Sequence, residues 1–152
     1  MSKVVEKLIQ ELNEAQKTAV KNPLLSCTKI VAGAGTGKTK IISKRFTKLT
    51  FDLINENVEN PTSRILVITF TDKAANEMKG RIIDELNLNG LNAFGDELWI
   101  STFHGFCNKI LRKHSIEANL APDFELAEES ELLKIYQNII KTLNLFIGLK
   151  NH

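Results

Sequence analysis

The sequence predicts an α/β domain in which helices flank a parallel sheet, and three observations support this class. A glycine-rich stretch at residues 32–39 stands between an apolar run and a long amphipathic segment. Residues 64–70 form a continuously hydrophobic run, typical of a strand covered on both faces of a parallel sheet. Strand and helix patterns alternate up to about residue 116, and the last third of the chain is helical only.

The composition is that of an ordinary globular protein. The chain has 152 residues, 43% hydrophobic and 25% charged, which suits one domain with a buried core. A net charge of +2 is too small to indicate a nucleic-acid partner by itself. Cys27 and Cys107 lack metal-type spacing, and the sequence shows neither a membrane-length apolar run nor a signal peptide. We therefore expect a cytoplasmic protein with no membrane partner.

Two short helices are predicted before the glycine-rich stretch. Apolar residues at helical spacing indicate the first at residues 3–11. The second is expected to begin after Asn13 as N-cap and to end near Pro23. Gln16 stands three residues after Asn13, which is the spacing of a capping box. A purely structural role for Gln16 therefore stays open.

Residues 25–31 are predicted to form the first strand and to lead into a phosphate-binding loop. Glycines let successive N–H groups converge, and the following helix directs its positive end at the same point. Lys38 would reach the β- and γ-phosphates of a nucleotide, and the Thr39 hydroxyl would hold Mg²⁺. A plain glycine-rich turn is the alternative. The candidate residues are Ala32, Gly33, Ala34, Gly35, Thr36, Gly37, Lys38 and Thr39, with Ala32 in place of the first glycine of the strict pattern.

The helix after the loop is predicted to bury one apolar face and to expose a basic one, which is ordinarily only solvated surface. The apolar set is Ile42, Phe46, Leu49 and Leu53, and the basic set is Lys40, Lys44, Arg45 and Lys48. A second strand at 64–70 and a third at 98–101 follow. Thr71 or Asp72 is expected to cap the intervening helix, whose inward residues are Ala75, Met78, Ile82 and Leu86. Further helices are predicted at residues 104–114 and 130–143.

Four stretches taken in order resemble the N-terminal motifs of the UvrD/Rep/PcrA group of superfamily 1 DNA helicases. Residues 12–16 resemble the Q motif, 32–39 motif I, 68–78 motif Ia and 101–107 motif Ib. The resemblance continues through Pro122 and the following helix, and so covers nearly the whole chain. It implies a P-loop NTPase (RecA-like) sheet, incomplete, in residues 1–116, and the start of an all-helical inserted subdomain in residues 117–152.

The resemblance also implies two sites. ATP and Mg²⁺ would bind at Gln16, which reads adenine in the family, together with the loop 32–39, Lys40 and Arg45. Single-stranded DNA would bind at Phe70, Thr71, Thr102 and His104, with Phe70 stacking on a base. From the residues alone, core filler at a strand end is the favoured interpretation of Phe70, and a capping or core role of His104 is supported as well as a DNA contact.

Two positions depart from the family pattern. Lys40 replaces an arginine beside the adenine, and Asp72 replaces an asparagine near the expected DNA track. An ATPase of this kind also needs a carboxylate pair after a buried strand. Asp72 and the pair Asp96–Glu97 are poor candidates for it. In the family, the acidic motif, the arginine finger and the second RecA-like domain lie beyond a point matching His152.

The resemblance implies that the chain is the ATP- and single-stranded-DNA-binding part of an ATP-dependent 3′–5′ DNA helicase acting in repair or replication. The intact protein would be an ATP hydrolase, and the chain alone is expected to be inactive. A subunit of a helicase-nuclease related to RecB and AddA, and a nucleotide-binding module without hydrolysis, are the alternatives. The remaining helicase domains are expected partners, and open sheet edges predict self-association of the isolated chain.

Overall fold

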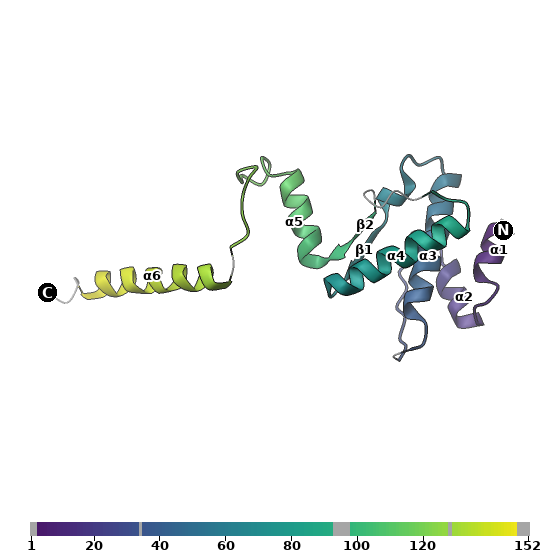
Figure 1. Cartoon of the computed structure of the whole chain (residues 1–152), viewed down its shortest axis with the longest axis horizontal. Coiled ribbons are helices and arrows are strands. Elements are labelled where there is room, and N and C mark those ends of the chain that lie inside the picture. The colour runs from purple at the N-terminus through teal and green to yellow at the C-terminus, as the bar shows by residue number, and fades with distance from the viewer. Residues whose placement is uncertain (1–2, 34, 93–97, 128, 149–152) are drawn as a thin grey trace. The chain divides into compact units, whose positions relative to one another are not determined.

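The computed structural model describes residues 3–33, 35–92, 98–127 and 129–148. The chain divides into two compact units, Met1–Ile110 and Leu111–His152. The first unit holds a small parallel sheet with helices around it (Figure 1). Its helices are α1 (Lys3–Ile9), α2 (Glu14–Lys21), α3 (Lys38–Asn55), a 3₁₀ turn η1 (Pro61–Arg64), α4 (Asp72–Leu88) and the first part of α5 (Phe103–Lys113).

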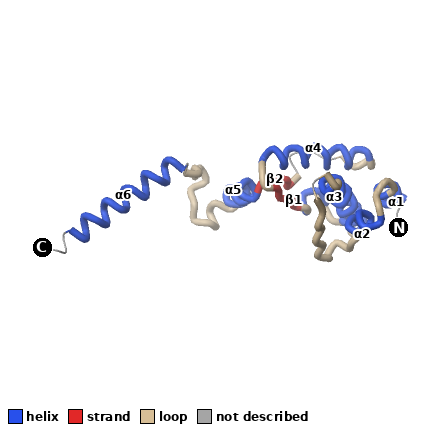
Figure 2. The backbone as a smooth tube through the Cα atoms, turned by 90° about the horizontal axis from the view of Figure 1, so that it is seen from below, coloured by secondary structure: helices blue, strands red, loops and turns tan. Residues whose placement is uncertain are grey.

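The sheet pairs β1 (Leu66–Thr69) with β2 (Trp99–Thr102), and the two strands are parallel. In the register, Leu66 lies opposite Trp99 and Thr69 opposite Thr102. Figure 2 shows α4 running alongside the strands, as a crossover helix between parallel neighbours must. The predicted parallel pairing and both strand positions are confirmed to within two residues.

Helix α4 buries the stripe that its periodicity predicted. Its four inward residues are Ala75, Met78, Ile82 and Leu86, and all four are buried. Three of them join Phe46 of α3 and Leu98, beside β2, in the main core cluster. Burial of a large apolar side chain stabilises a fold by about 1.5–3 kcal/mol, so this cluster fixes α3 and α4 against the sheet.

A second cluster packs the N-terminal helices against the start of α3. It consists of Leu8, Ile9, Leu12, Ala19, Val20 and Ile41. Ile41 belongs to the first turn of α3, directly behind the glycine-rich loop. The N-terminal helices therefore support the helix that the loop feeds.

The predicted strand at residues 25–31 is wrong. This segment is irregular, and Leu25 and Val31 have 98% and 84% of their surface exposed. A strand needs a neighbour to pair its N–H and C=O groups, and the described sheet contains only β1 and β2. The sheet described has two strands where the sequence predicted three.

The second unit ends in α6 (Glu129–Gly148), which is longer than the predicted helix. Its apolar residues from Leu132 to Leu143 are exposed, among them Leu133 and Tyr136. The segment between α5 and α6 contacts the end of α5, where the guanidinium carbon of Arg112 lies 4.9 Å from the ring centre of Phe124. The predicted domain boundary at residue 116 stays a prediction.

Candidate nucleotide and DNA sites

The glycine-rich loop turns sharply into α3. Gly35 and Gly37 adopt left-handed backbone angles, with φ of 74° and 85°. Residues with a Cβ disfavour these angles, so the turn requires glycine at both positions. Gly37 is the N-cap of α3 and supplies no side-chain cap. The first N–H groups of this 18-residue helix can therefore bind an anion. Ala34 lies outside the described residues.

The two predicted catalytic residues lie at the beginning of α3. Lys38 Nζ donates one hydrogen bond to the Ala32 carbonyl at 2.9 Å and another to the Gly33 carbonyl. Its ammonium is thereby held inside the loop, next to the helix N-terminus. Thr36 Oγ1 donates to the same Gly33 carbonyl at 2.8 Å, which braces the turn, and Thr39 is half-buried in the first turn of the helix.

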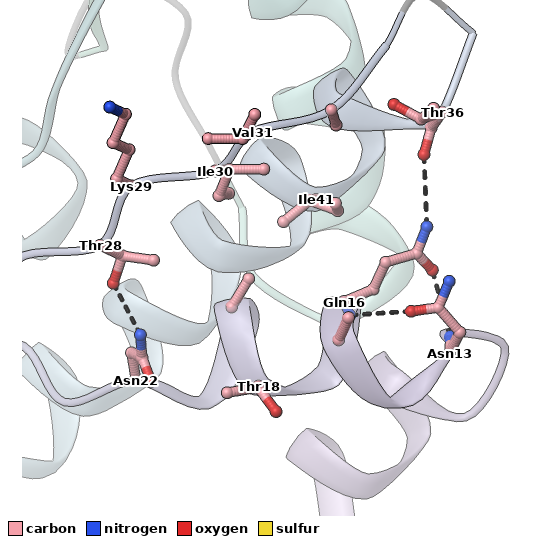
Figure 3. Close-up of a pocket in the computed structure, with 13 residues that line it drawn as sticks. Asn13, Gln16, Thr18, Asn22, Thr28, Lys29, Ile30, Val31, Thr36 and Ile41 are labelled. Atoms are coloured by element: carbon pink, nitrogen blue, oxygen red, sulfur yellow. Dashed lines mark hydrogen bonds between the residues drawn. The ribbon is translucent and has the colours of Figure 1, made fainter.

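A pocket of about 380 Å³ opens between α2 and the segment that leads into the loop (Figure 3). Ile30 and Ile41 supply apolar surface in its middle. At one side, Asn22 Nδ2 donates to Thr28 Oγ1 at 2.7 Å and ties α2 to the segment. The volume and the mix of apolar and amide groups are typical of sites for small molecules.

Gln16 lies at the other side of the pocket and joins α2 to the loop. Its Oε1 accepts from Asn13 N at 3.1 Å, and Asn13 Oδ1 accepts from Gln16 N at 2.9 Å, so the predicted capping box is present. Its Nε2 also donates to the Thr36 carbonyl at 3.3 Å. A primary amide has two hydrogens and two lone pairs, so each end of the group can make one more bond. Capping and adenine recognition by Gln16 are therefore compatible.

The prediction that the basic face of α3 is solvated is wrong for Lys44. Its side chain is only 7% exposed and pairs with Glu11 at 3.1 Å and Glu85 at 3.2 Å. Lys48 pairs with Asp52 on the next turn, and Lys40 pairs with Glu11 at 2.9 Å. Within the described residues, this face of α3 is an ion-pair network that links the turn after α1 to α4.

Arg45 binds the end of α2. Its Nη1 donates to the carbonyls of Ala19 and Asn22, both at 3.0 Å, and to that of Val20 at 3.3 Å. Its Nη2 donates to the Pro23 carbonyl at 3.4 Å. A cation that satisfies the last carbonyls of a helix caps it and complements its dipole. This structural role is what the geometry of Arg45 shows, and its predicted contact with nucleotide stays a prediction.

The carboxyl edge of the sheet carries the residues predicted to bind DNA. Phe70, directly after β1, is 98% exposed, so the core-filler alternative is wrong. His104 is exposed as well, which excludes the core alternative for it. Phe103 is 60% exposed and lies edge-on to the His104 ring, with 6.2 Å between the ring centres. The sequence analysis did not name Phe103 as a candidate DNA-binding residue. Its position directly after a predicted strand is the sequence signal that could have identified it.

Thr71 and Thr102 cap the two helices that begin at this edge. Thr71 Oγ1 accepts from Ala74 N at 3.2 Å, and Thr102 Oγ1 accepts from Gly105 N at 3.2 Å. Capping uses a lone pair of each hydroxyl and leaves its hydrogen able to donate. Two helix N-termini and two hydroxyl donors therefore lie at one edge, an arrangement that suits phosphate groups.

Of the acidic residues considered in the sequence, the pair Asp96–Glu97 falls outside the described residues. Within the described ranges, no group of three or more histidine, cysteine or acidic side chains is placed to hold a metal ion. None of the described helices combines the length and apolar character that crossing a membrane requires.

Thr28, Ile30 and Ile41 line the pocket although the sequence did not predict them there. Sequence spacing does not show which residues meet between α2 and the segment that leads into the loop.

The loop, α3 and the pocket lie together on an α/β unit, an arrangement that suits a site for a small anionic ligand. Comparison with known proteins agrees, because residues 12–151 match the family described as the UvrD/REP helicase N-terminal domain. The chain belongs to this family. The match begins at Leu12 and includes all four motifs found in the sequence.

Named relatives extend this result. The chain is 38% identical over 143 residues to DNA helicase II of Escherichia coli, covering 93% of this chain and 18% of the relative. It is 36% identical over 148 residues to the ATP-dependent DNA helicase PcrA of Bacillus subtilis, covering 95% and 18%. It is 36% identical over 134 residues to the ATP-dependent DNA helicase SRS2 of Saccharomyces cerevisiae, covering 88% and 11%. The chain thus spans less than a fifth of the length of these relatives.

Proposed function

We propose that the chain binds ATP, with adenine in the pocket beside Gln16 and phosphates at the loop. The observation that carries this proposal is the 3.3 Å bond from Gln16 Nε2 to the Thr36 carbonyl, which joins the pocket to the loop. A nucleotide would then extend from amide and apolar groups to Lys38 and the start of α3. The names of two relatives, which are ATP-dependent helicases, support the same ligand.

Magnesium would be held mainly by the nucleotide. Mg²⁺ prefers oxygen ligands, keeps several waters and binds few protein groups. Thr39 supplies one hydroxyl beside Lys38, and the described residues contain no acidic cluster to add to it. When bound, the ion neutralises charge on the β- and γ-phosphates. Because neither described strand is followed by a carboxylate pair that could orient water, we expect the 152-residue chain to hydrolyse ATP very slowly.

The carboxyl edge of the sheet is proposed to bind single-stranded DNA. Phe70 offers a ring for stacking, and Thr71, Thr102 and His104 offer contacts to phosphates. Ligands of open parallel sheets bind at this edge, which supports placing the strand there. Phosphate contacts carry no sequence information, so the binding is expected to be weak, salt-sensitive and tolerant of sequence.

The whole protein is proposed to be an ATP-dependent DNA helicase with 3′–5′ polarity, in a RecA-like fold whose other parts act as partners of this chain. Its pathway would be repair or replication, in the cytoplasm. The reported relatives are named as helicases, which favours this function and gives no support to the helicase-nuclease alternative. A nucleotide-binding module without hydrolysis describes the isolated chain rather than the intact protein.

The test compares Mg-ATP binding with steady-state turnover on the 152-residue chain, with and without single-stranded DNA. We expect saturable binding of Mg-ATP, weaker binding of Mg-GTP, and almost no turnover. Absence of any nucleotide binding by the folded chain would contradict the proposed site. Turnover at helicase-like rates on adding DNA would contradict the inactive state proposed for this chain.

A further inference from the structure

One carboxylate joins the turn after α1 to the first two turns of α3. Glu11 Oε2 lies 2.9 Å from Lys40 Nζ, and Glu11 Oε1 lies 3.1 Å from Lys44 Nζ. Lys44 has a second carboxylate partner, Glu85 of α4, at 3.2 Å. Lys40 has Glu11 as its ion-pair partner among the described residues. Loss of the Glu11 carboxylate would therefore leave Lys40 without its ion pair, whereas Lys44 would keep its pair with Glu85.

Lys40 lies close to the proposed phosphate site. It belongs to the first turn of α3, where a helical rise of about 1.5 Å per residue puts its backbone about 3 Å along the axis from Lys38, and its side chain leaves the helix on a different side, toward Glu11. Its side chain is 46% exposed, so its ammonium can reorient in solvent, whereas Lys44 is enclosed between two carboxylates. Charges at a protein surface interact over roughly one Debye length, about 10 Å at 0.1 M salt, so we expect phosphates at the loop to interact with the charges of Lys40 and Glu11.

Glu11 carries its charge at neutral pH. Hydrogen bonds from Lys40 and then Lys44, together with the positive charge of Lys44, hold the pKa of Glu11 below its ordinary value. The carboxylate is thus a fixed negative charge beside the helix end that would receive a polyphosphate.

We propose that Glu11 limits the affinity of the loop for nucleotide, by pairing with Lys40 and opposing negative charge at the start of α3. This inference rests on the proposed nucleotide-binding function. Bound phosphates and the Glu11 carboxylate compete for the same ammonium, so each weakens the other's interaction with Lys40. Removing the charge of Glu11 makes Lys40 available to phosphates, while Lys44 keeps Glu85 and the fold keeps its buried pair.

The experiment is a calorimetric titration of Mg-ATP and Mg-ADP into the 152-residue chain and into Glu11→Gln. We expect about three- to tenfold tighter binding of both nucleotides by the variant, with the gain shrinking as salt is raised. Glu14→Gln is the matched control, because Glu14 is an exposed carboxylate three residues away that pairs with Lys17 instead. It should leave the affinity unchanged.

A double-mutant cycle assigns the effect to Lys40. In a Lys40→Met background, Glu11→Gln should no longer tighten binding appreciably. The inference is overturned if Glu11→Gln is folded and binds no tighter, if Glu14→Gln gives the same gain, or if the gain persists without Lys40. A folded wild-type chain that binds no adenine nucleotide overturns the proposed function and this inference together, whereas normal wild-type binding without a Glu11→Gln effect overturns this inference alone.

Discussion

At the scale of single residues, Gln16 connects helix capping with the nucleotide site. Its oxygen accepts from the Asn13 backbone, and its nitrogen donates to the Thr36 carbonyl of the loop. Helix capping and adenine recognition by Gln16 are therefore compatible. Different substitutions of Gln16 remove different bonds. Alanine removes both bonds, whereas glutamate keeps the acceptor and loses the donor.

Gln16→Ala should abolish the preference for ATP over GTP, because adenine presents an N7 acceptor and an N6 donor that a primary amide can match and a methyl group cannot. It should also lower the free energy of unfolding by about 1 kcal/mol, because the capping bond to the Asn13 backbone is lost. Gln16→Glu keeps the capping bond and can accept from N6 but cannot donate to N7, so it should weaken ATP binding. Competition binding and urea unfolding measure these effects. An unchanged ATP preference in Gln16→Ala would restrict Gln16 to its capping role.

Phe70→Ala should weaken single-stranded DNA binding by about 1–3 kcal/mol, the usual value of one stacked base. Because the ring is 98% exposed, the substitution should leave the stability of the fold unchanged. Fluorescence anisotropy with a labelled oligonucleotide measures the affinity. Leu88→Ala, at the other end of α4 and 73% exposed, is the control and should bind like the wild type. Equal DNA affinity for Phe70→Ala and wild type would show that the Phe70 ring does not stack on a base.

At the scale of elements, Arg45 holds α2 against α3. Arg45→Ala leaves the last carbonyls of α2 without their charged donor, so we expect a loss of about 1–3 kcal/mol in unfolding free energy. Urea denaturation measures it. Arg64→Ala, at an exposed arginine of η1, should cost far less. Comparable losses for the two variants would show that the cap contributes little.

The ion pairs of Glu11, in the turn after α1, with Lys40 and Lys44 of α3 should make stability depend on pH. The pKa of Glu11 is lowered in the folded chain, first by the hydrogen bond from Lys40. The stabilising contribution is therefore present above the unfolded pKa and is lost as pH falls through the folded value. Thermal unfolding between pH 7 and pH 3 should show a decline below about pH 4.5 that is shallower in Glu11→Gln. Superimposable pH profiles would contradict this role.

Local patterns predicted some elements well and others badly. The stripe of α4 was predictable because four apolar residues at helical spacing allow only one buried face. The burial of Lys44 was not, because Glu85 lies 41 residues away and periodicity carries no information on such a partner. Residues 25–31 read as a strand by composition, but a strand exists only with a hydrogen-bonded neighbour. For the site, the loop and Gln16 were found from motifs, whereas Thr28 and Ile41 depended on tertiary packing.

At the scale of the whole molecule, exposed apolar residues should drive self-association of the isolated chain. Leu25, Val31 and the apolar residues of α6 from Leu132 to Leu143 expose hydrophobic side chains to solvent. Apolar patches beyond a few hundred Å² are rarely left bare on soluble monomers. Light scattering should show a mass that rises with concentration, and Leu25→Ser with Val31→Ser should reduce it. A monomer at millimolar concentration that binds no hydrophobic dye would contradict this expectation.

The loop before α3 is proposed to bind the phosphates of ATP, and replacing Lys38 is the sharpest test of this site. Lys38→Ala removes the ammonium held at the Ala32 and Gly33 carbonyls without touching either core cluster. Titration of Mg-ATP should show binding by the wild-type chain and by Lys113→Ala, an exposed lysine of α5, and no measurable binding by Lys38→Ala at an unchanged melting temperature. Undiminished affinity in a folded Lys38→Ala chain would contradict the account.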